Sequence, residues 1–431
     1  MIDYLKQVFS LEDLRKRFIY TLLMFAIYRL GSHIPLPGVD TTALQDFFKS
    51  FEGTLFYLYD IFSGGNLSRM TLFALGIMPY ISASIMMQLL TVAVPELQRL
   101  AKEEGDYGRY KINQYTRYLT ILVAFVQSLG IAFWLRSQVS PKGYPLVLEG
   151  GVFFILTTVI ALVSSTMFLM WVGDRITEKG IGNGMSLLIF AGIVAGFPNA
   201  IVRIYDMLKN GDITPFAVAG AVIFVVVVTF GIVFIQEAER RIPVQHPRRQ
   251  IGKQEIIGGS TYLPIKINPA GVIPIIFAQS LLIIPSTVLG FIQHPIGKAL
   301  HDAFNPTTFL YNFLYVLFII FFTYFYTAVL INPADVAENL RKAGAFIPGV
   351  RPGQDTQRLL EGIINRLAFV GAIFLSVVAV IPVFVSIWLK VPFYYGGTTA
   401  LIVVGVALDT LNKIEASLLQ RKYTQYRRKV R

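Results

Sequence analysis

The stretch LFALGIMPYISASIMMQLLT, residues 72–91, carries the two features on which the fold depends. It is apolar enough for a membrane, but Gly76 and Pro79 interrupt it near its start. The preceding residues 56–75 include Asp60 and are too polar and too interrupted to span a bilayer. Irregular backbone at membrane depth is tolerated only where protein or a water-filled cavity surrounds it. A half-helix followed by a spanning helix therefore indicates a pore.

The composition excludes an ordinary soluble protein. Of the 431 residues, 54% are hydrophobic and 15% are charged, and the mean hydropathy is +0.59. Soluble domains are typically about 25% charged. Cysteine is absent, which excludes disulfides, a thiol nucleophile and cysteine metal ligands. The net charge of +12 points to an anionic membrane surface or to nucleic acid.

Apolar runs long enough to cross a membrane recur along the chain. A span needs about 20 apolar residues, and the runs that meet this rule are 18–34, 76–95, 117–135, 151–173, 184–202, 213–235, 268–292, 309–331, 367–389 and 396–413. The first run follows three basic residues, as a signal peptide would, but no small-residue cleavage site follows it. We therefore expect a retained first span and ten transmembrane helices.

The positive charges predict the orientation of these spans. Nine of the 38 Lys and Arg residues lie in one set of alternating loops, which leaves 29 in the other set, together with both termini. The positive-inside rule places both termini in the cytoplasm. An even span count agrees with this orientation. Ten spans divide into five and five, which predicts two inverted halves, residues 1–202 and 203–431.

The residues needed for enzyme chemistry or ion coupling are missing from the sequence pattern. The four histidines lie at span ends or in loops, and neither a zinc-protease motif nor a phosphate-binding loop occurs. We therefore expect no catalytic residues, no metal and no cofactor. Only Arg29 and Asp409 are ionisable within the predicted spans, both near span ends. Intramembrane charges mark ion pathways, so their scarcity argues against a proton- or sodium-coupled pump.

Two groups of polar residues remain open to more than one interpretation. Neutral polar residues inside spans either form ordinary interhelical hydrogen bonds or line a seam that opens sideways. The long basic loops 236–267 and 332–366 either anchor on anionic lipid or dock an acidic partner or RNA phosphates. Few aromatic residues occur in these loops, which favours contact with a nucleic-acid backbone over base stacking.

Long motifs in the chain resemble the bacterial SecY family. They are LFALGIMPYISASIMMQLL (72–90), GIGNGMSLLIFAGIVAG (180–196), NPAGVIPIIFAQS (268–280), GAFIPGVRPG (344–353) and KVPFYYGGTTALIVV (390–404). The resemblance implies an all-α polytopic membrane protein. Ten helices in two inverted five-helix halves would surround a central pore, which a plug half-helix closes. It also implies a protein-conducting channel in the bacterial cytoplasmic membrane, which translocates unfolded polypeptides and releases transmembrane segments sideways into lipid.

The resemblance also implies the roles of individual residues. The pore ring would be Ile81, Ile85, Ile189, Ile193, Ile276 and Ile402. The plug, about residues 57–72, would include Tyr57, Ile61, Gly64, Gly65, Leu67 and Arg69. Candidates for the lateral gate are Ser84, Gln88, Thr91, Gln279 and Ser280. Docking of SecA or the ribosome would use Arg241, Arg248, Arg249, Lys253 and Arg351.

The partners implied by the resemblance supply both energy and clients. SecE and SecG would complete the channel, while the SecA ATPase or the translating ribosome, through possible RNA contact, would drive transport. Signal peptides and nascent polypeptides would be the clients, and anionic lipids would surround the basic loops. The alternatives are a secondary transporter of a small solute, which would need charged groups at the midplane, and a membrane-embedded enzyme.

Overall fold

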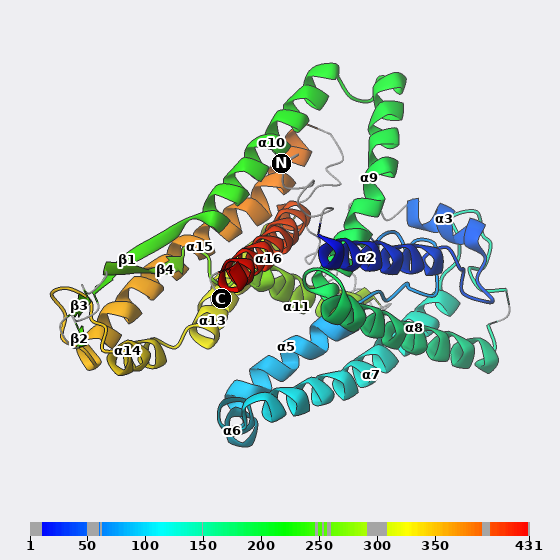
Figure 1. Ribbon diagram of the computed structural model, residues 1–431. Helices are drawn as coiled ribbons and strands as arrows, with labels where there is room; N and C mark the ends of the chain where they lie inside the picture. Colours follow the sequence, from blue (N-terminus) through cyan, green and yellow to red (C-terminus); the bar gives the residue numbers. More distant parts are fainter. Residues whose placement is uncertain are drawn as a thin grey trace. The chain divides into compact units, whose positions relative to one another are not determined.

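The computed structural model in Figure 1 divides into two compact units. Unit 1 comprises Met1–Met207, Ile283–Pro306 and Val406–Arg431, and unit 2 comprises Leu208–Leu282 and Thr307–Gly405. Within them, the structure describes residues 11–49, 60, 63–148, 150–245, 249–251, 254–256, 260–290, 308–389 and 397–429. Most of these residues are helical.

Unit 1 is a group of helices packed around α7 and α8. Its elements are α2 (Glu12–Gly31), α3 (Thr41–Lys49), α5 (Met78–Ala93), α6 (Pro95–Glu103), α7 (Gly105–Ser137), α8 (Val152–Lys179), most of α9 (Gly184–Asn210) and most of α16 (Gly397–Lys429). Helix α7 packs along both α5 and α8, and α2 packs on α8 (Figure 1).

Unit 2 combines helices with two short hairpins. Its elements are α10 (Pro215–Glu237), β1 (Glu239–Gln245), β2 (Arg249–Ile251), β3 (Gln254–Ile256), β4 (Ser260–Lys266), the first part of α11 (Ile273–Gly290), α13 (Phe309–Leu330), α14 (Pro333–Lys342), α15 (Gln354–Leu389) and the start of α16. Helix α15 packs against α10, α13 and α14.

Each of the ten predicted spans overlaps one helix: α2, α5, α7, α8, α9, α10, α11, α13, α15 and α16. Among the described residues, six helices are long and apolar enough to cross a membrane, or seven if the bent pair α5 and α6 is counted as one span. The prediction of an all-α, multi-pass membrane protein is confirmed.

The breaks around α5 have local causes in the sequence. Gly76 has a φ of +55°, which a residue with a side chain adopts only with strain. Pro79 lies in the first turn of α5, where the missing N–H of proline costs no hydrogen bond. Pro95 begins α6 in the same way, and the chain bends by 102° between α5 and α6. The spanning helix is therefore bounded on both sides by backbone that cannot continue it.

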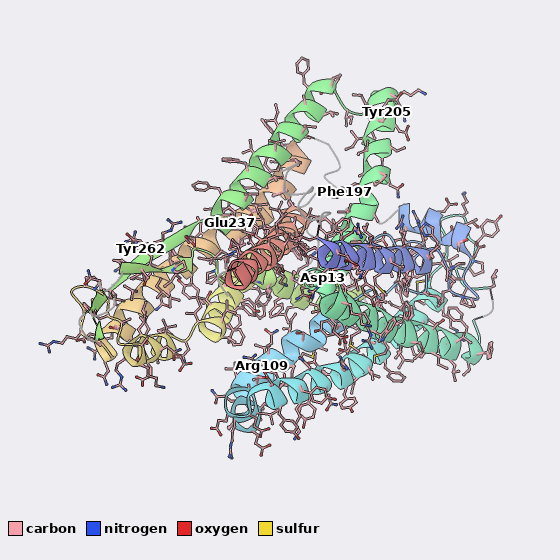
Figure 2. The ribbon with its side chains drawn as sticks, in the orientation of Figure 1. Asp13, Arg109, Phe197, Tyr205, Glu237 and Tyr262 are labelled. Atoms are coloured by element: carbon pink, nitrogen blue, oxygen red, sulfur yellow. The ribbon has the colours of Figure 1, made fainter. Side chains whose placement is uncertain are left out.

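The loop 236–267 is a pair of hairpins, a feature that the sequence did not predict. Strands β1 and β4 pair antiparallel from Glu239 opposite Lys266 to Gln245 opposite Ser260, and β2 pairs with β3. Side chains alternate along β1, with Ile242 and Val244 buried between exposed neighbours. In Figure 2 Tyr262 lies on this hairpin, where its side chain is exposed.

A hydrophobic core in unit 1 holds the segment that precedes α5. Aromatic rings from α3 and α7 form its centre, with Phe47 5.6 Å from Trp134 between ring centroids. Leu67 and Met70 are buried in the same core. Two backbone hydrogen bonds add to this: Leu36 N donates to Met70 O at 2.8 Å, and Leu72 N donates to Ile34 O at 2.9 Å. The end of the segment before α5 is thus fixed to the chain that follows α2.

Candidate functional site

The isoleucines assigned to the pore ring are on four helices. They are Ile81 and Ile85 on α5, Ile189 and Ile193 on α9, Ile276 on α11 and Ile402 on α16. Five of the six are buried and the one on α11 is half-buried. The two on α5 lie about one turn apart, as do the two on α9, so each pair occupies one helix face. Four belong to unit 1 and two to unit 2.

The plug segment is partly described. Tyr57 and Ile61 lie outside the described residues. From Gly64 to Ile77 the chain forms successive turns rather than a continuous helix. This part of the plug therefore derives its shape from side-chain hydrogen bonds and from its contacts, not from a helical backbone.

Asp60 is hydrogen-bonded to the turn that follows it, residues 63–68. Its side-chain Oδ1 accepts hydrogen bonds from Ser68 N at 2.8 Å and from Ser63 Oγ at 3.4 Å. Its carbonyl oxygen accepts from Gly65 N at 2.8 Å. Burial raises the pKa of the Asp60 carboxyl, while the hydrogen bonds from Ser68, Leu67 and Ser63 oppose that rise. A buried carboxyl that accepts bonds from both sides of the turn holds the turn closed.

The two glycines of the plug have the same backbone conformation but different surroundings. Gly64 and Gly65 both have a φ of +77°. A Cβ on Gly64 would lie 2.9 Å from the Cα of Gly192 on α9, whereas one on Gly65 would meet nothing within 4 Å among the described residues. The plug thus touches α9 backbone to backbone, next to Ile193. This contact could not be predicted from the sequence, because it joins residues far apart in the chain.

Tyr28 of α2 makes a second contact with the predicted plug segment, and the sequence did not predict it either. Its side chain is buried, and its hydroxyl bonds to Ser63 and Asn66 of the plug segment. The available signal was a tyrosine within the first span, since a buried tyrosine hydroxyl usually has a hydrogen-bond partner.

The gate candidates carry polar atoms that lack partners. On α5, Gln88 Nε2 donates to Ser84 Oγ at 3.3 Å, but the buried Gln88 Oε1 has no partner among the described residues. Thr91 Oγ1 donates to the Met87 carbonyl. On α11, Gln279 and Ser280 are buried, and the side-chain oxygen of each also lacks a partner among the described residues. Unpaired buried polar atoms cost about 1–3 kcal/mol each, so these positions are energetically unfavourable in the conformation seen.

The two basic loops, predicted separately, form one structure in unit 2. Gln245 at the end of β1 and Phe346 in the second loop exchange two backbone hydrogen bonds, of 2.9 and 3.0 Å. Beneath them, Ile242 of the first loop packs in one cluster with Ile347 and Leu360. The pairing and the shared core make the two loops a single platform.

Three of the five predicted docking residues lie within the described residues. Arg241 and Arg351 are exposed on the platform. Arg249 is the first residue of β2, while Arg248 and Lys253 lie outside the described residues. The platform therefore presents at least two guanidinium groups to the surroundings.

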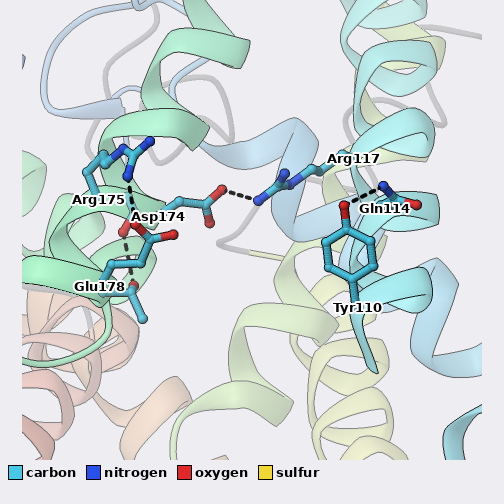
Figure 3. A network of polar contacts seen from close by, with 8 residues as sticks. Tyr110, Gln114, Arg117, Asp174, Arg175 and Glu178 are labelled. Atoms are coloured by element: carbon cyan, nitrogen blue, oxygen red, sulfur yellow. Dashed lines mark hydrogen bonds and ion pairs between the residues drawn. The ribbon is translucent and has the colours of Figure 1, made fainter. Parts of the chain in front are cut away.

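A polar network joins α7 to α8 in unit 1 (Figure 3). Arg117 Nη2 lies 2.6 Å from Asp174 Oδ2, and Arg175 pairs with Glu178 at 2.8 Å. These side chains are partly exposed, and exposed ion pairs contribute about 0–1 kcal/mol. Arg109, labelled in Figure 2, lies in the first part of α7. The network steadies the packing of α7 on α8.

Comparison with known proteins gives consistent matches over the chain. A family model described as SecY matches residues 71–411. Protein translocase subunit SecY of Aquifex aeolicus strain VF5 is 67% identical over 429 residues, covering 100% of both chains. A solved structure concerned with the plug domain of the SecY protein has a TM-score of 0.66 at 18% identity, covering 93% of this chain and 92% of that one. An idle yeast Ssh1 complex bound to the yeast 80S ribosome has a TM-score of 0.60 at 18% identity, covering 96% and 90%. At these identities the two structures show the fold.

Proposed function

The chain belongs to the SecY family, and from this premise we propose how its residues form, seal and open a channel for polypeptides. It is a multi-pass membrane protein and a protein-conducting translocation channel. The observation that carries this function is 67% identity with a protein translocase subunit along the whole length of both chains.

The seal at rest comes from the isoleucine ring and the plug. A constriction lined only by aliphatic side chains repels water, and a dewetted pore excludes ions. The same side chains can change rotamer to admit an extended polypeptide. The burial of Ile81, Ile85, Ile189 and Ile193 supports this role. The plug, residues 57–72, closes the pore at rest and moves away when a polypeptide enters.

Sideways release uses a lateral gate whose candidate residues lie on α5 and on α11. Its candidates are Ser84, Gln88, Thr91, Gln279 and Ser280. The unpaired buried oxygens of Gln88, Gln279 and Ser280 support this role, because opening of the seam gives such atoms access to water or to a polar peptide. Each leucine-like residue of a client favours the lipid by about 0.3–0.6 kcal/mol. Apolar segments therefore leave for the bilayer, and polar segments cross.

Energy comes from partners that dock on the basic platform. SecA, with its ATP, or the translating ribosome binds the surface that carries Arg241 and Arg351, with Arg248, Arg249 and Lys253 in the same loops. Exposed guanidinium groups suit acidic side chains and RNA phosphates alike. The likeness in fold to a yeast complex that is bound to a ribosome supports the second partner. SecE and SecG complete the channel, and no catalytic group is assigned to this chain.

The channel lies in the bacterial cytoplasmic membrane with both termini in the cytoplasm. The distribution of Lys and Arg supports this orientation. It places the basic platform on the cytoplasmic side, where SecA, ribosomes and anionic lipids are found. The halves 1–202 and 203–431 are inverted relative to each other, as an odd number of spans in each half requires.

Reconstitution tests the function directly. The full chain is incorporated into vesicles with SecE and SecG, and SecA and ATP are added with a polypeptide that carries a signal sequence. We expect ATP-dependent uptake of the polypeptide, measured by protection from added protease. Efficient exchange of a small solute without any polypeptide uptake would refute the channel function.

A further inference from the structure

We propose that Tyr28 of α2 holds the plug in its closed position through hydrogen bonds to Ser63 and Asn66. We call the Tyr28 hydroxyl, the Ser63 carbonyl and the Asn66 amide the plug latch. The proposal rests on the assignment of residues 57–72 as the plug, and it adds the positioning residue that keeps the plug in place.

The hydrogen bonds of the plug latch are buried. The Tyr28 hydroxyl donates to the Ser63 carbonyl oxygen at 3.2 Å and accepts from Asn66 Nδ2 at 3.4 Å. The same Asn66 Nδ2 also donates to the Ser63 carbonyl oxygen. Tyr28 is 5% exposed, and Ser63 and Asn66 are each 1% exposed. Because water does not reach these groups, loss of the Tyr28 hydroxyl leaves one N–H of the buried Asn66 amide without its acceptor and removes one bond to the Ser63 carbonyl.

Other contacts hold both Tyr28 and Asn66 in position for the hydrogen bond between them. The Tyr28 ring stacks on Phe73, with centroids 5.9 Å apart and planes 8° apart, and Phe73 stacks in turn on Phe168 of α8. On the plug side, Thr71 Oγ1 donates to Asn66 Oδ1 at 3.1 Å, which orients the amide toward Tyr28. Hydrogen bonds between groups already held in place lose less conformational entropy on forming.

The plug latch lies at the point where the plug meets α9. A Cβ on Gly64 would lie 3.2 Å from the Tyr28 hydroxyl and 2.9 Å from Gly192 Cα. Gly192 directly precedes Ile193 of the proposed ring. The hydroxyl therefore holds the plug against the helix that supplies part of the constriction.

The chain around the plug latch has one fixed end. Met70 and Leu72 are tied by backbone hydrogen bonds to the residues after α2, and Leu67 is buried in the core of unit 1. Among the described plug residues, displacement therefore involves Ser63 and Gly64 before Leu67, Met70 and Leu72. This movement breaks the bonds to Tyr28, so the free energy of the plug latch adds to the cost of opening.

The test uses Tyr28→Phe, which keeps the stacked ring and removes only the hydroxyl. The matched control is Tyr20→Phe, the same change on the same helix about two turns earlier. Each variant of the full chain is reconstituted with SecE and SecG, and ion conductance is measured without any polypeptide. A net hydrogen bond is worth about a two- to tenfold change in an equilibrium. We therefore expect Tyr28→Phe to raise the resting leak about two- to tenfold and Tyr20→Phe to leave it unchanged.

A second variant separates the plug latch from a general loss of stability. Asn66→Ala is expected to raise the leak by a similar factor. The double variant should raise it by less than the product of the two factors, because each single change already breaks the bond between Tyr28 and Asn66. A merely structural role of Tyr28 would lower the thermal midpoint and polypeptide uptake along with the seal. We expect uptake with SecA and ATP to persist in all three variants.

Deletion of residues 57–72 distinguishes the two levels of the proposal. If the deletion raises the leak while Tyr28→Phe and Asn66→Ala do not, the plug latch is refuted and the plug stands. If the deletion leaves the leak unchanged, both are refuted, although polypeptide uptake by the wild type would still support the channel. If Tyr28→Phe does not fold, the leak of Asn66→Ala alone decides.

Discussion

The contact between Gly64 and Gly192 can be tested by adding a single methyl group to the plug. Gly64→Ala places a Cβ 2.9 Å from Gly192 Cα and 3.1 Å from Gly192 O. Both are backbone atoms of a helix, so they cannot rotate away as a side chain could. Gly65→Ala is the matched control, since its φ of +77° is the same and its Cβ would meet nothing within 4 Å among the described residues.

The magnitude follows from two separate costs. A left-handed backbone destabilises an alanine by about 1–2 kcal/mol, and this effect is common to both variants. Overpacking destabilises the closed plug by about 1–3 kcal/mol more, and it occurs only in Gly64→Ala. The steric cost disappears when the plug moves off α9, so it shifts the equilibrium toward the displaced plug. A difference of 1–3 kcal/mol corresponds to roughly a 5- to 150-fold change in that equilibrium.

The assay is the resting ion conductance of the reconstituted channel in a planar bilayer. We expect Gly64→Ala to leak more than Gly65→Ala by roughly the 5- to 150-fold factor derived from the overpacking cost. A Cβ on Gly64 would also lie 3.2 Å from the Tyr28 hydroxyl, whereas one on Gly65 would meet neither group. Equal leaks from the two variants would therefore refute the close packing of the plug on α9 and on Tyr28.

Three further predictions concern docking, protonation and the seam. Arg351→Glu should impair SecA-dependent uptake without loss of folded protein. The control Arg358→Glu reverses another exposed charge seven residues later and should impair uptake less. Equal effects would show that net charge alone matters. Burial raises the pKa of Asp60 above its ordinary 3.8, so protonation favours the closed plug, and its stability falls as pH rises through the raised pKa. The resting leak should therefore rise as the pH rises through the raised pKa of Asp60. Asp60→Asn should abolish this pH dependence, and a dependence that persists in the variant would contradict the role of Asp60. Ser280→Ala removes a buried hydroxyl that lacks a partner among the described residues. The change should stabilise the purified protein by about 1 kcal/mol, measured as a higher thermal midpoint. A lower midpoint would show that the hydroxyl is bonded in the folded state.

The membrane spans could be predicted from the sequence because the bilayer demands a length of apolar residues that few other structures need. Their ends were less predictable. Helix α7 begins at Gly105, twelve residues before the apolar run at 117, because hydropathy marks only the apolar part of a helix and polar residues can continue the helix into water. The hairpin of β1 and β4 was missed for a related reason, since its charged and proline-containing strands resemble a loop until they pair.

The candidate site was predictable only where residue type carries the role. The aliphatic ring and the exposed arginines follow from the family resemblance. The contacts of the plug do not, because Tyr28 meets Asn66 from 38 positions away and Gly64 meets Gly192 from another helix. Such contacts depend on tertiary packing, and a glycine or tyrosine within an apolar segment gives no sign of its partner.

The central claim is that translocating polypeptides pass through the isoleucine ring. A photoactivatable cross-linking residue is placed at Ile193 on α9 or, as a control, at Val226 on α10, whose side chain is 62% exposed. A polypeptide is then stalled during SecA-driven uptake and the sample is irradiated. We predict cross-links to the polypeptide from position 193 and none above background from position 226. Equal cross-linking from both positions, or cross-linking from position 226 alone, would contradict the claim.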